Sequence, residues 1–186
     1  AQDTGDPRSV GWFCGSAADS GKVLLVADKR RFELFAQFVT QQFPEARRVF
    51  DIAGGMGKLN EALTARGLLA TTFDKRWKHA DVRYAERLFT LDEPCECDAV
   101  VGMHPDGATR IIVEYAAKHG VGFAIVPCCS DNGMPYKPWM RHLAELGGQL
   151  GLDVAEAALD MQGRSRVLVG RPKVAISVPD LPLVGH

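Results

Sequence analysis

The chain has 186 residues, of which 46% are hydrophobic, and its 22 Lys and Arg residues against 23 Asp and Glu residues give a formal net charge of -1. This balance excludes a global field that would attract nucleic acid or an anionic membrane. No apolar run approaches the roughly 18 to 20 residues of a membrane span, and the N-terminus lacks the pattern of a signal peptide. We therefore expect one soluble, cytoplasmic domain over residues 1–186, with its core at about 28–170.

Apolar runs and amphipathic stretches alternate along the chain, as a parallel α/β sheet requires. The pattern predicts strands over 49–53, 68–73, 83–89, 99–103 and 122–126. It predicts helices over 58–65, 108–118 and 138–150, and an earlier helix that Asp28 caps and Pro44 ends. A short apolar run at 23–26, after a loop rich in Gly and Ser, precedes that first helix.

The last two predicted strands, 154–159 and 166–169, are joined by "DMQGRS", which indicates a hairpin around Gly163. We therefore predict an α/β three-layer sandwich. Its mostly parallel seven-stranded sheet ends in an antiparallel hairpin, and helices cover both faces. The residues after the hairpin are expected to form an extended tail.

The stretch "VFDIAGGMGKLNEAL" places three glycines, Gly54, Gly55 and Gly57, between an apolar strand and a helix. Glycines let the backbone turn tightly and approach a ligand, and the helix N-terminus presents unpaired amides beside them. The pattern predicts a ligand-binding loop, with a tight turn that binds nothing as the alternative.

Spacing separates the cofactor classes that use such a loop. A P-loop requires a glycine where Ile52 stands and a hydroxyl residue where Leu59 stands, so that class is excluded. A dinucleotide-binding fingerprint requires a glycine at Asn60, which weakens a nicotinamide-binding oxidoreductase without eliminating it.

The remaining pattern resembles motif I of the class I (Rossmann-like) methyltransferases, which bind S-adenosylmethionine (SAM). Asp51, Ala53, Gly55 and Gly57 carry this resemblance, and a terminal hairpin is also typical of that family. Asp74 stands 23 residues after Asp51, where the family has an acidic residue that accepts hydrogen bonds from the ribose hydroxyls. The resemblance covers most of the chain.

The resemblance also implies roles for further residues. Asp51 would lie under the glycine loop and fix its amides near the methionine part of SAM, or it would only cap the loop. An acidic residue after the third strand would meet the adenine amine. Glu86 and Asp92 both fit, and Glu86 is included in the predicted cofactor site with Gly54.

Polar residues follow the fourth and fifth predicted strands, in "GMHPDGAT" and "VPCCSDNGMPY". Ligands bind beyond the carboxyl ends of such strands. These two motifs resemble those of the tRNA uridine ribose 2'-O-methyltransferases and related small bacterial proteins. The matching residues are Gly102, His104, Asp106, Thr109, Pro127, Cys128 and Cys129.

His104 and Asp106 are the candidate catalytic residues. Methyl transfer to a hydroxyl or an amine needs a base, and an imidazole with an ordinary pKa near 6.5 can serve, with Asp106 orienting it or binding the acceptor. The structural alternatives are that His104 caps the strand end and that Asp106 is the N-cap of the following helix.

The five cysteines form no regular framework, so we expect reduced thiols and no metal site. Cys128 and Cys129 fit buried pocket-lining thiols better than nucleophiles, because the local sequence supplies no base or cation to activate them.

Basic and aromatic residues cluster in "DKRWKH" just after Asp74. This run fits a phosphate-binding and stacking surface or, more commonly, a solvated loop. Tyr136, Trp139 and Met140 are candidates for an acceptor pocket wall or for the core, and Arg30 and Arg31 are expected on the exposed face of the first helix.

Together these patterns predict a SAM-dependent methyltransferase, monomeric or weakly dimeric, that releases S-adenosylhomocysteine. Its methyl acceptor is expected to be an RNA nucleotide, with a small molecule as the alternative. A non-catalytic SAM-binding module remains the rival from another functional class.

Overall fold

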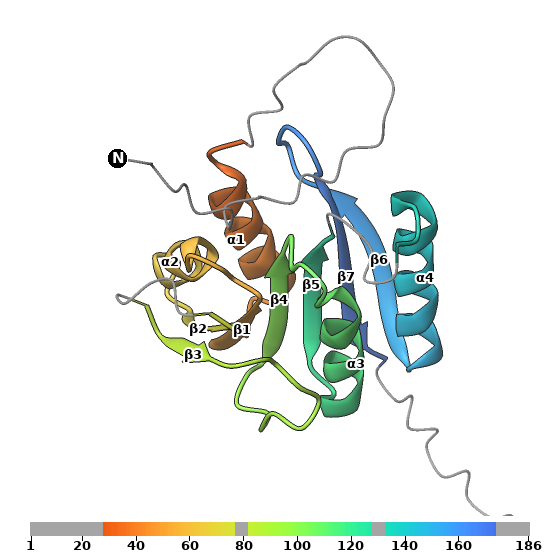
Figure 1. Ribbon diagram of the computed structural model, residues 1–186, viewed down its shortest axis with the longest axis horizontal. Coiled ribbons are helices and arrows are strands. Elements are labelled where there is room, and N and C mark those ends of the chain that lie inside the picture. The colour runs from red at the N-terminus through yellow and green to blue at the C-terminus, as the bar shows by residue number, and fades with distance from the viewer. Residues whose placement is uncertain (1–27, 77–81, 128–132, 174–186) are drawn as a thin grey trace, which may run out of the picture.

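The computed structural model describes residues 28–76, 82–127 and 133–173, and within these ranges the chain forms one seven-stranded sheet of order β3-β2-β1-β4-β5-β7-β6 (Figure 1). The strands are β1 (Arg48–Ile52), β2 (Leu69–Asp74), β3 (Tyr84–Glu86), β4 (Ala99–Met103), β5 (Gly122–Val126), β6 (Leu152–Ala158) and β7 (Arg166–Pro172). All neighbours pair in parallel except β7, which runs antiparallel to both β5 and β6. The predicted topology with its terminal hairpin is confirmed.

Helices cover both faces of the sheet. They are α1 (Arg31–Gln42), α2 (Lys58–Thr64), α3 (Thr109–His119) and α4 (Tyr136–Gln149). The pair α1 and α2 packs on one face and the pair α3 and α4 on the other, and each pair closes its own hydrophobic cluster (Figure 1). The predicted three-layer sandwich is therefore present.

The apolar runs become central strands because both of their faces are covered. All five residues of β4 and all five of β5 are buried, as expected for parallel strands between two helical layers. Gly120 ends α3 in a left-handed conformation with φ 65°, and the basic residues Lys118 and His119 occupy its last turn. Local sequence and tertiary packing thus agree across the middle of the sheet.

The third strand is shorter than predicted. It has three residues, Tyr84–Glu86, whereas the predicted strand covered residues 83–89. The strand is shorter because the chain leaves the sheet after Glu86. The apolar residue Phe89 then fills the core instead of pairing, with its ring centroid 5.1 Å from that of Phe73 and 4.7 Å from that of Tyr115. A buried aromatic outside a strand gives the same hydrophobic signal as one inside it.

The first helix also begins later than Asp28. Arg30 occupies the N-cap position, and the Asp28 carboxylate accepts the Arg30 amide at 2.9 Å. The predicted run at 23–26, the Gly- and Ser-rich loop before it and the C-terminal tail lie outside the described residues.

Close packing between β5 and β7 gives a stability prediction. A Cβ at Gly170 would lie 2.1 Å from Cε1 of the fully buried Phe123, which has no room to move. We expect Gly170→Ala to lower the free energy of unfolding by about 1–3 kcal/mol. Urea denaturation followed by circular dichroism measures this change.

Gly148 in α4 is the matched control, since nothing lies within 4 Å of the position that its Cβ would take. We expect Gly148→Ala to be neutral or to stabilise the helix by up to about 1 kcal/mol. Equal stability of the two variants would contradict the packing account.

Candidate functional site

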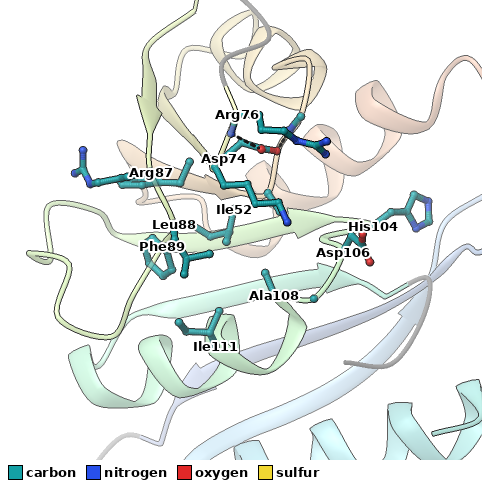
Figure 2. Close-up of a pocket in the computed structure, with 15 residues that line it drawn as sticks. Ile52, Asp74, Arg76, Arg87, Leu88, Phe89, His104, Asp106, Ala108 and Ile111 are labelled. Carbon is teal, nitrogen blue, oxygen red and sulfur yellow. Dashed lines mark hydrogen bonds between the residues drawn. The ribbon is translucent and has the colours of Figure 1, made fainter. Parts of the chain in front are cut away.

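A cavity of about 540 Å³ opens at the carboxyl ends of β1, β2 and β4 (Figure 2). Ligands of open α/β sheets bind at this edge. The residues that line it are Ile52, Ala53, Gly55, Phe73, Asp74, Lys75, Arg76, Arg87, Leu88, Phe89, His104, Asp106, Gly107, Ala108 and Ile111. The cavity therefore combines an apolar floor with a few polar groups, as is typical of small-molecule sites.

The glycine loop and the acidic residue predicted to act with it meet in this cavity. The amide of Gly55 donates to Oδ2 of Asp74 at 3.1 Å, and the amide of Arg76 donates to Oδ1 at 3.1 Å. An ionised carboxylate has about four acceptor positions, so two amides leave further capacity on both oxygens. Of the three loop glycines, Gly55 lines the cavity together with Asp74, whereas Gly54 and Gly57 do not.

Tyr84 of β3 holds this arrangement together, and the sequence analysis did not identify it. Its hydroxyl lies 3.1 Å from the carbonyl oxygen of Gly55 and 2.8 Å from that of Arg76, so it joins the glycine loop to the segment after β2. Burial, and then the negative charge of Asp74, raise the pKa of Tyr84 to about 12. The phenol therefore stays protonated and remains a donor at neutral pH.

Asp51 lies beneath the loop rather than in the cavity. It is fully buried, and its Oδ2 accepts a hydrogen bond from the Thr72 hydroxyl at 3.1 Å. Oδ1 is buried and has no hydrogen-bond partner. Gly54 packs directly against this carboxylate, since a Cβ there would lie 2.1 Å from Oδ2. Asp51 and Gly54 thus pack against each other and do not line the cavity.

Gly57 lies at the start of the helix that follows the glycine loop. It is the N-cap of α2 and adopts a left-handed conformation with φ 71°. A Cβ at this position would lie 2.8 Å from Cγ2 of Val82. Both the backbone conformation and the available space therefore favour glycine.

Two residues that lack the conformational freedom of glycine also adopt the left-handed conformation, and both line the cavity. Ala53 follows β1 with φ 53°, and His104 follows β4 with φ 54°. Their amides still bind neighbouring strands, donating to Phe73 O at 2.7 Å and Val126 O at 2.9 Å. Such conformations cost about 1–3 kcal/mol and cluster at functional sites. Both strands thus turn away from the sheet at the point where the cavity begins.

His104 and Asp106 both line the cavity, as expected for candidate catalytic residues. The His104 imidazole points away from Asp74 and Leu88, while Asp106 lies beside it on the same turn (Figure 2). Burial lowers the pKa of His104, and the charges of Arg31 and Arg164 lower it further. The neutral, proton-accepting form therefore dominates at pH 7. Its Nδ1 is buried and has no hydrogen-bond partner.

The turn between β4 and α3 depends on local packing. A Cβ at Gly102 would lie 2.8 Å from both Pro105 Cγ and Ile112 Cδ1, so glycine lets the chain fold back over the strand. Asp106 does not occupy the N-cap position of α3, which was its predicted alternative role. Ala108 occupies that position, with no side-chain hydrogen bond to the helix.

The other predicted residues lie in different places. Glu86 is exposed at the end of β3 and does not line the cavity. Asp92 is also exposed, and it does not line the cavity either. Tyr136 is half-buried, whereas Trp139 and Met140 are buried in the core at the start of α4. The adenine contact of Glu86 remains a prediction.

The cavity wall includes apolar residues that the sequence analysis missed. Leu88, Phe89 and Ile111 come from the segment after β3 and from α3, and Leu88 is 71% exposed. No periodic pattern marks them, because two of them lie outside regular structure.

Of the basic cluster after Asp74, Lys75 and Arg76 line the cavity, and residues 77–79 lie outside the described residues. Cys128 and Cys129 also lie outside them. Cys95 and Cys97 are free thiols. Within the described ranges no group of three or more His, Cys, Asp or Glu side chains is placed to hold a metal ion, and no helix combines the length and apolar character of a membrane span.

Comparisons with known proteins identify the fold. No protein-family model matches the sequence, and no curated protein matches it. Among solved structures, DesVI from Streptomyces venezuelae is 15% identical with a TM-score of 0.57, over 76% of this chain and 90% of that one. The sugar N-methyltransferase KedS8 from Streptoalloteichus sp ATCC 53650 is 14% identical with a TM-score of 0.57, over 89% of this chain and 100% of that one.

A third similar structure contains a cofactor. Magnesium protoporphyrin IX methyltransferase (ChlM) from Synechocystis PCC 6803, solved with bound SAM, is 14% identical with a TM-score of 0.55, over 83% of this chain and 86% of that one. At these identities the likeness defines the architecture. The chain has the Rossmann-like fold of the class I methyltransferases.

The buried carboxyl of Asp51 gives a prediction about pH. Burial raises its pKa from 3.8 to about 7, against the hydrogen bond from Thr72. Between these two values the folded protein keeps a proton that the unfolded chain has released, so the free energy of unfolding falls as pH rises. We expect the stability of the wild type relative to Asp51→Asn to fall between about pH 4 and 7 in urea titrations.

Asp98 is the matched control. Its pKa is lowered by hydrogen bonds from the backbone amides of Arg48 and Arg47, so it is ionised in both states over most of this window. The profile of Asp98→Asn should run parallel to that of the wild type. A parallel profile for Asp51→Asn as well would show that Asp51 is already charged in the fold.

Proposed function

We propose that this protein is a SAM-dependent methyltransferase. The observation that carries the proposal is the meeting of the Gly55 amide and the Asp74 carboxylate at the mouth of a cavity at the carboxyl edge of the sheet. A nucleoside needs a carboxylate for its two ribose hydroxyls, amides for polar groups beside them and an apolar slot for its base. This chain offers the carboxylate and the apolar surface within one cavity, and the amides of Gly55 and Arg76 hold that carboxylate in place.

The residues of the cavity fit the cofactor on three counts. Both oxygens of Asp74 retain acceptor capacity beyond their single amide bonds. Leu88 and Ile111 provide apolar surface for the adenine ring. The volume of about 540 Å³ lies within the range of small-molecule sites.

SAM, when bound, supplies an electrophilic methyl group, and the chain then has to position an acceptor and remove its proton. His104 is suited to the second task, because its lowered pKa keeps the imidazole neutral at pH 7. Asp106 lies beside it on the same turn and is suited to orient either the imidazole or the acceptor (Figure 2).

An RNA nucleotide is the acceptor class that we propose first, on the resemblance of the "GMHPDGAT" and "PCC" motifs to RNA ribose methyltransferases. A small molecule is the second candidate, since KedS8 is a sugar N-methyltransferase of similar fold. Incubation with methyl-labelled SAM and fractionated cell extract, total RNA included, decides between them. Cofactor binding without labelling of any fraction would favour a non-catalytic SAM-binding module.

Asp74 gives the direct test of the cofactor site. We expect Asp74→Ala to weaken SAM binding about 10-fold or more, because the ribose hydroxyls lose a charged acceptor. Isothermal titration calorimetry measures the affinity, and circular dichroism checks that the variant is folded. Asp153→Ala, an exposed position of β6 outside the cavity, is the control and should bind as the wild type does. A folded Asp74→Ala protein with unchanged affinity would remove this assignment.

His104 gives a test of the chemistry. We expect His104→Ala to lower turnover about 100-fold or more, while the affinity for SAM stays close to that of the wild type. Activity of the wild type should rise with pH through a midpoint below 6.5, since the pKa of His104 is lowered. His142→Ala on α4, outside the cavity, should keep the wild-type profile. Equal activity of His104→Ala and the wild type would show that His104 is not the base.

A further inference from the structure

A chain of hydrogen bonds between buried side chains runs from α2 to the carboxyl group of Asp51. Asn60 of α2 and Thr72 of β2 are only 2% and 0% exposed. Nδ2 of Asn60 lies 3.1 Å from Oγ1 of Thr72, and the Thr72 hydroxyl donates to Oδ2 of Asp51 at 3.1 Å. Buried polar side chains are costly unless they are paired, so a connected set of three outside the cavity needs an explanation.

The surroundings of Asn60 fix the direction in which these hydrogen bonds run. Its Nδ2 also faces the carbonyl oxygens of Ala70 at 3.2 Å and Arg83 at 3.1 Å, and its Oδ1 accepts from the Thr64 hydroxyl at 3.2 Å. A reversed amide would place Oδ1 against two carbonyl oxygens, which only accept. Because Nδ2 cannot accept either, the Thr72 oxygen receives a hydrogen bond there and turns its own proton toward the carboxyl group.

The carboxyl end of this chain contacts the glycine loop. A Cβ at Gly54 would lie 2.1 Å from Oδ2 of Asp51 and 2.7 Å from Cγ2 of Thr72, so the loop backbone packs against both side chains. The next residue, Gly55, donates its amide to Asp74 at the cavity. The chain of hydrogen bonds therefore ends one residue away from the amide that holds the Asp74 carboxylate.

We propose that Asn60 and Thr72 are positioning residues of the cofactor site. Asn60 orients the Thr72 hydroxyl, and that hydroxyl fixes the Asp51 carboxyl group against Gly54. The loop is thereby kept in the conformation that presents Asp74 to the ribose. This proposal rests on the proposed methyltransferase function and adds to it two residues that do not line the cavity.

The proposal also accounts for the residue type at position 60. A dinucleotide-binding fingerprint has a glycine there, which allows a close approach of helix and strand. In this chain the Asn60 side chain fills that space and joins α2 to β2 and to the residue before β3 through its amide. An asparagine at this position therefore gives the loop a support that a glycine cannot give.

Two substitutions of Thr72 separate positioning from packing. Thr72→Val keeps the shape of the side chain and removes the hydroxyl, whereas Thr72→Ser keeps the hydroxyl and removes a buried methyl group. We expect Thr72→Val to weaken SAM binding about 10-fold and Thr72→Ser to bind within about 2-fold of the wild type. Isothermal titration calorimetry measures the affinity, and urea denaturation shows that each variant is folded. Equal SAM affinity of the two folded variants would overturn the proposal.

The loop gives a second measurement, which needs no cofactor. Hydrogen exchange of the Gly55 amide, followed by NMR, reports how often its bond to Asp74 opens. We expect about 10-fold faster exchange in Thr72→Val than in the wild type, and little change in Thr72→Ser. Thr71→Val is the matched control, because Thr71 precedes Thr72 in β2 and its side chain points to the opposite face of the strand. Wild-type exchange in Thr72→Val would also overturn the proposal.

Asn60→Ala tests whether Asn60 acts through Thr72, and it gives the same comparison if Thr72→Val does not fold. The double variant should bind SAM within about 2-fold of Thr72→Val alone, because both changes break one chain. Effects that multiply would overturn the role of Asn60. A wild type that does not bind SAM would refute the methyltransferase function, whereas the Gly55 exchange rates would still decide whether Asn60 and Thr72 position the loop.

Discussion

The hydrogen bond from the Gly55 amide to the Asp74 carboxylate is the interaction on which the site depends. It joins the loop after β1 to the end of β2 at 3.1 Å, and Tyr84 from β3 reinforces it by bridging the carbonyl oxygens of Gly55 and Arg76. The segments that follow the carboxyl ends of β1 and β2 are thereby tied to the start of β3. The carboxylate keeps a fixed place at the cavity mouth, with part of its acceptor capacity still open to a ligand.

The end of β4 borders the cavity that Asp74, Leu88 and Ile111 also line. His104 follows this strand in a left-handed conformation that a histidine adopts only at an energetic cost. In the proposed function the fold accepts that cost because the turn places His104 at the cavity.

Much of the fold and part of the cavity could be predicted from local sequence. The alternation of apolar runs predicted the order of the strands, and Gly55 and Asp74 meet at the cavity, whereas Gly54 and Gly57 do not line it. The length of β3 could not be predicted, since Phe89 gives the same apolar signal in the core as in a strand. The tie made by Tyr84 was also missed, because a lone tyrosine carries no pattern.

The surroundings of Arg31 could not be predicted from the sequence either. Arg31 was expected on an exposed helix face, but it is half-buried and donates to the carbonyl oxygen of Asp28. The hairpin between β6 and β7 meets the same segment through contacts over 130 residues apart, such as that between Asp28 and Gln162. Only the tertiary arrangement brings these segments together.

The central claim is that the cavity at the ends of β1, β2 and β4 holds an adenosyl group against Asp74. A crystal structure of the protein with S-adenosylhomocysteine tests it most directly. The account predicts both ribose hydroxyls within hydrogen-bond distance of the Asp74 carboxylate and the adenine ring between Leu88 and Ile111. Electron density for the nucleoside at another surface, with the Asp74 carboxylate contacting only its own backbone amides, would contradict it.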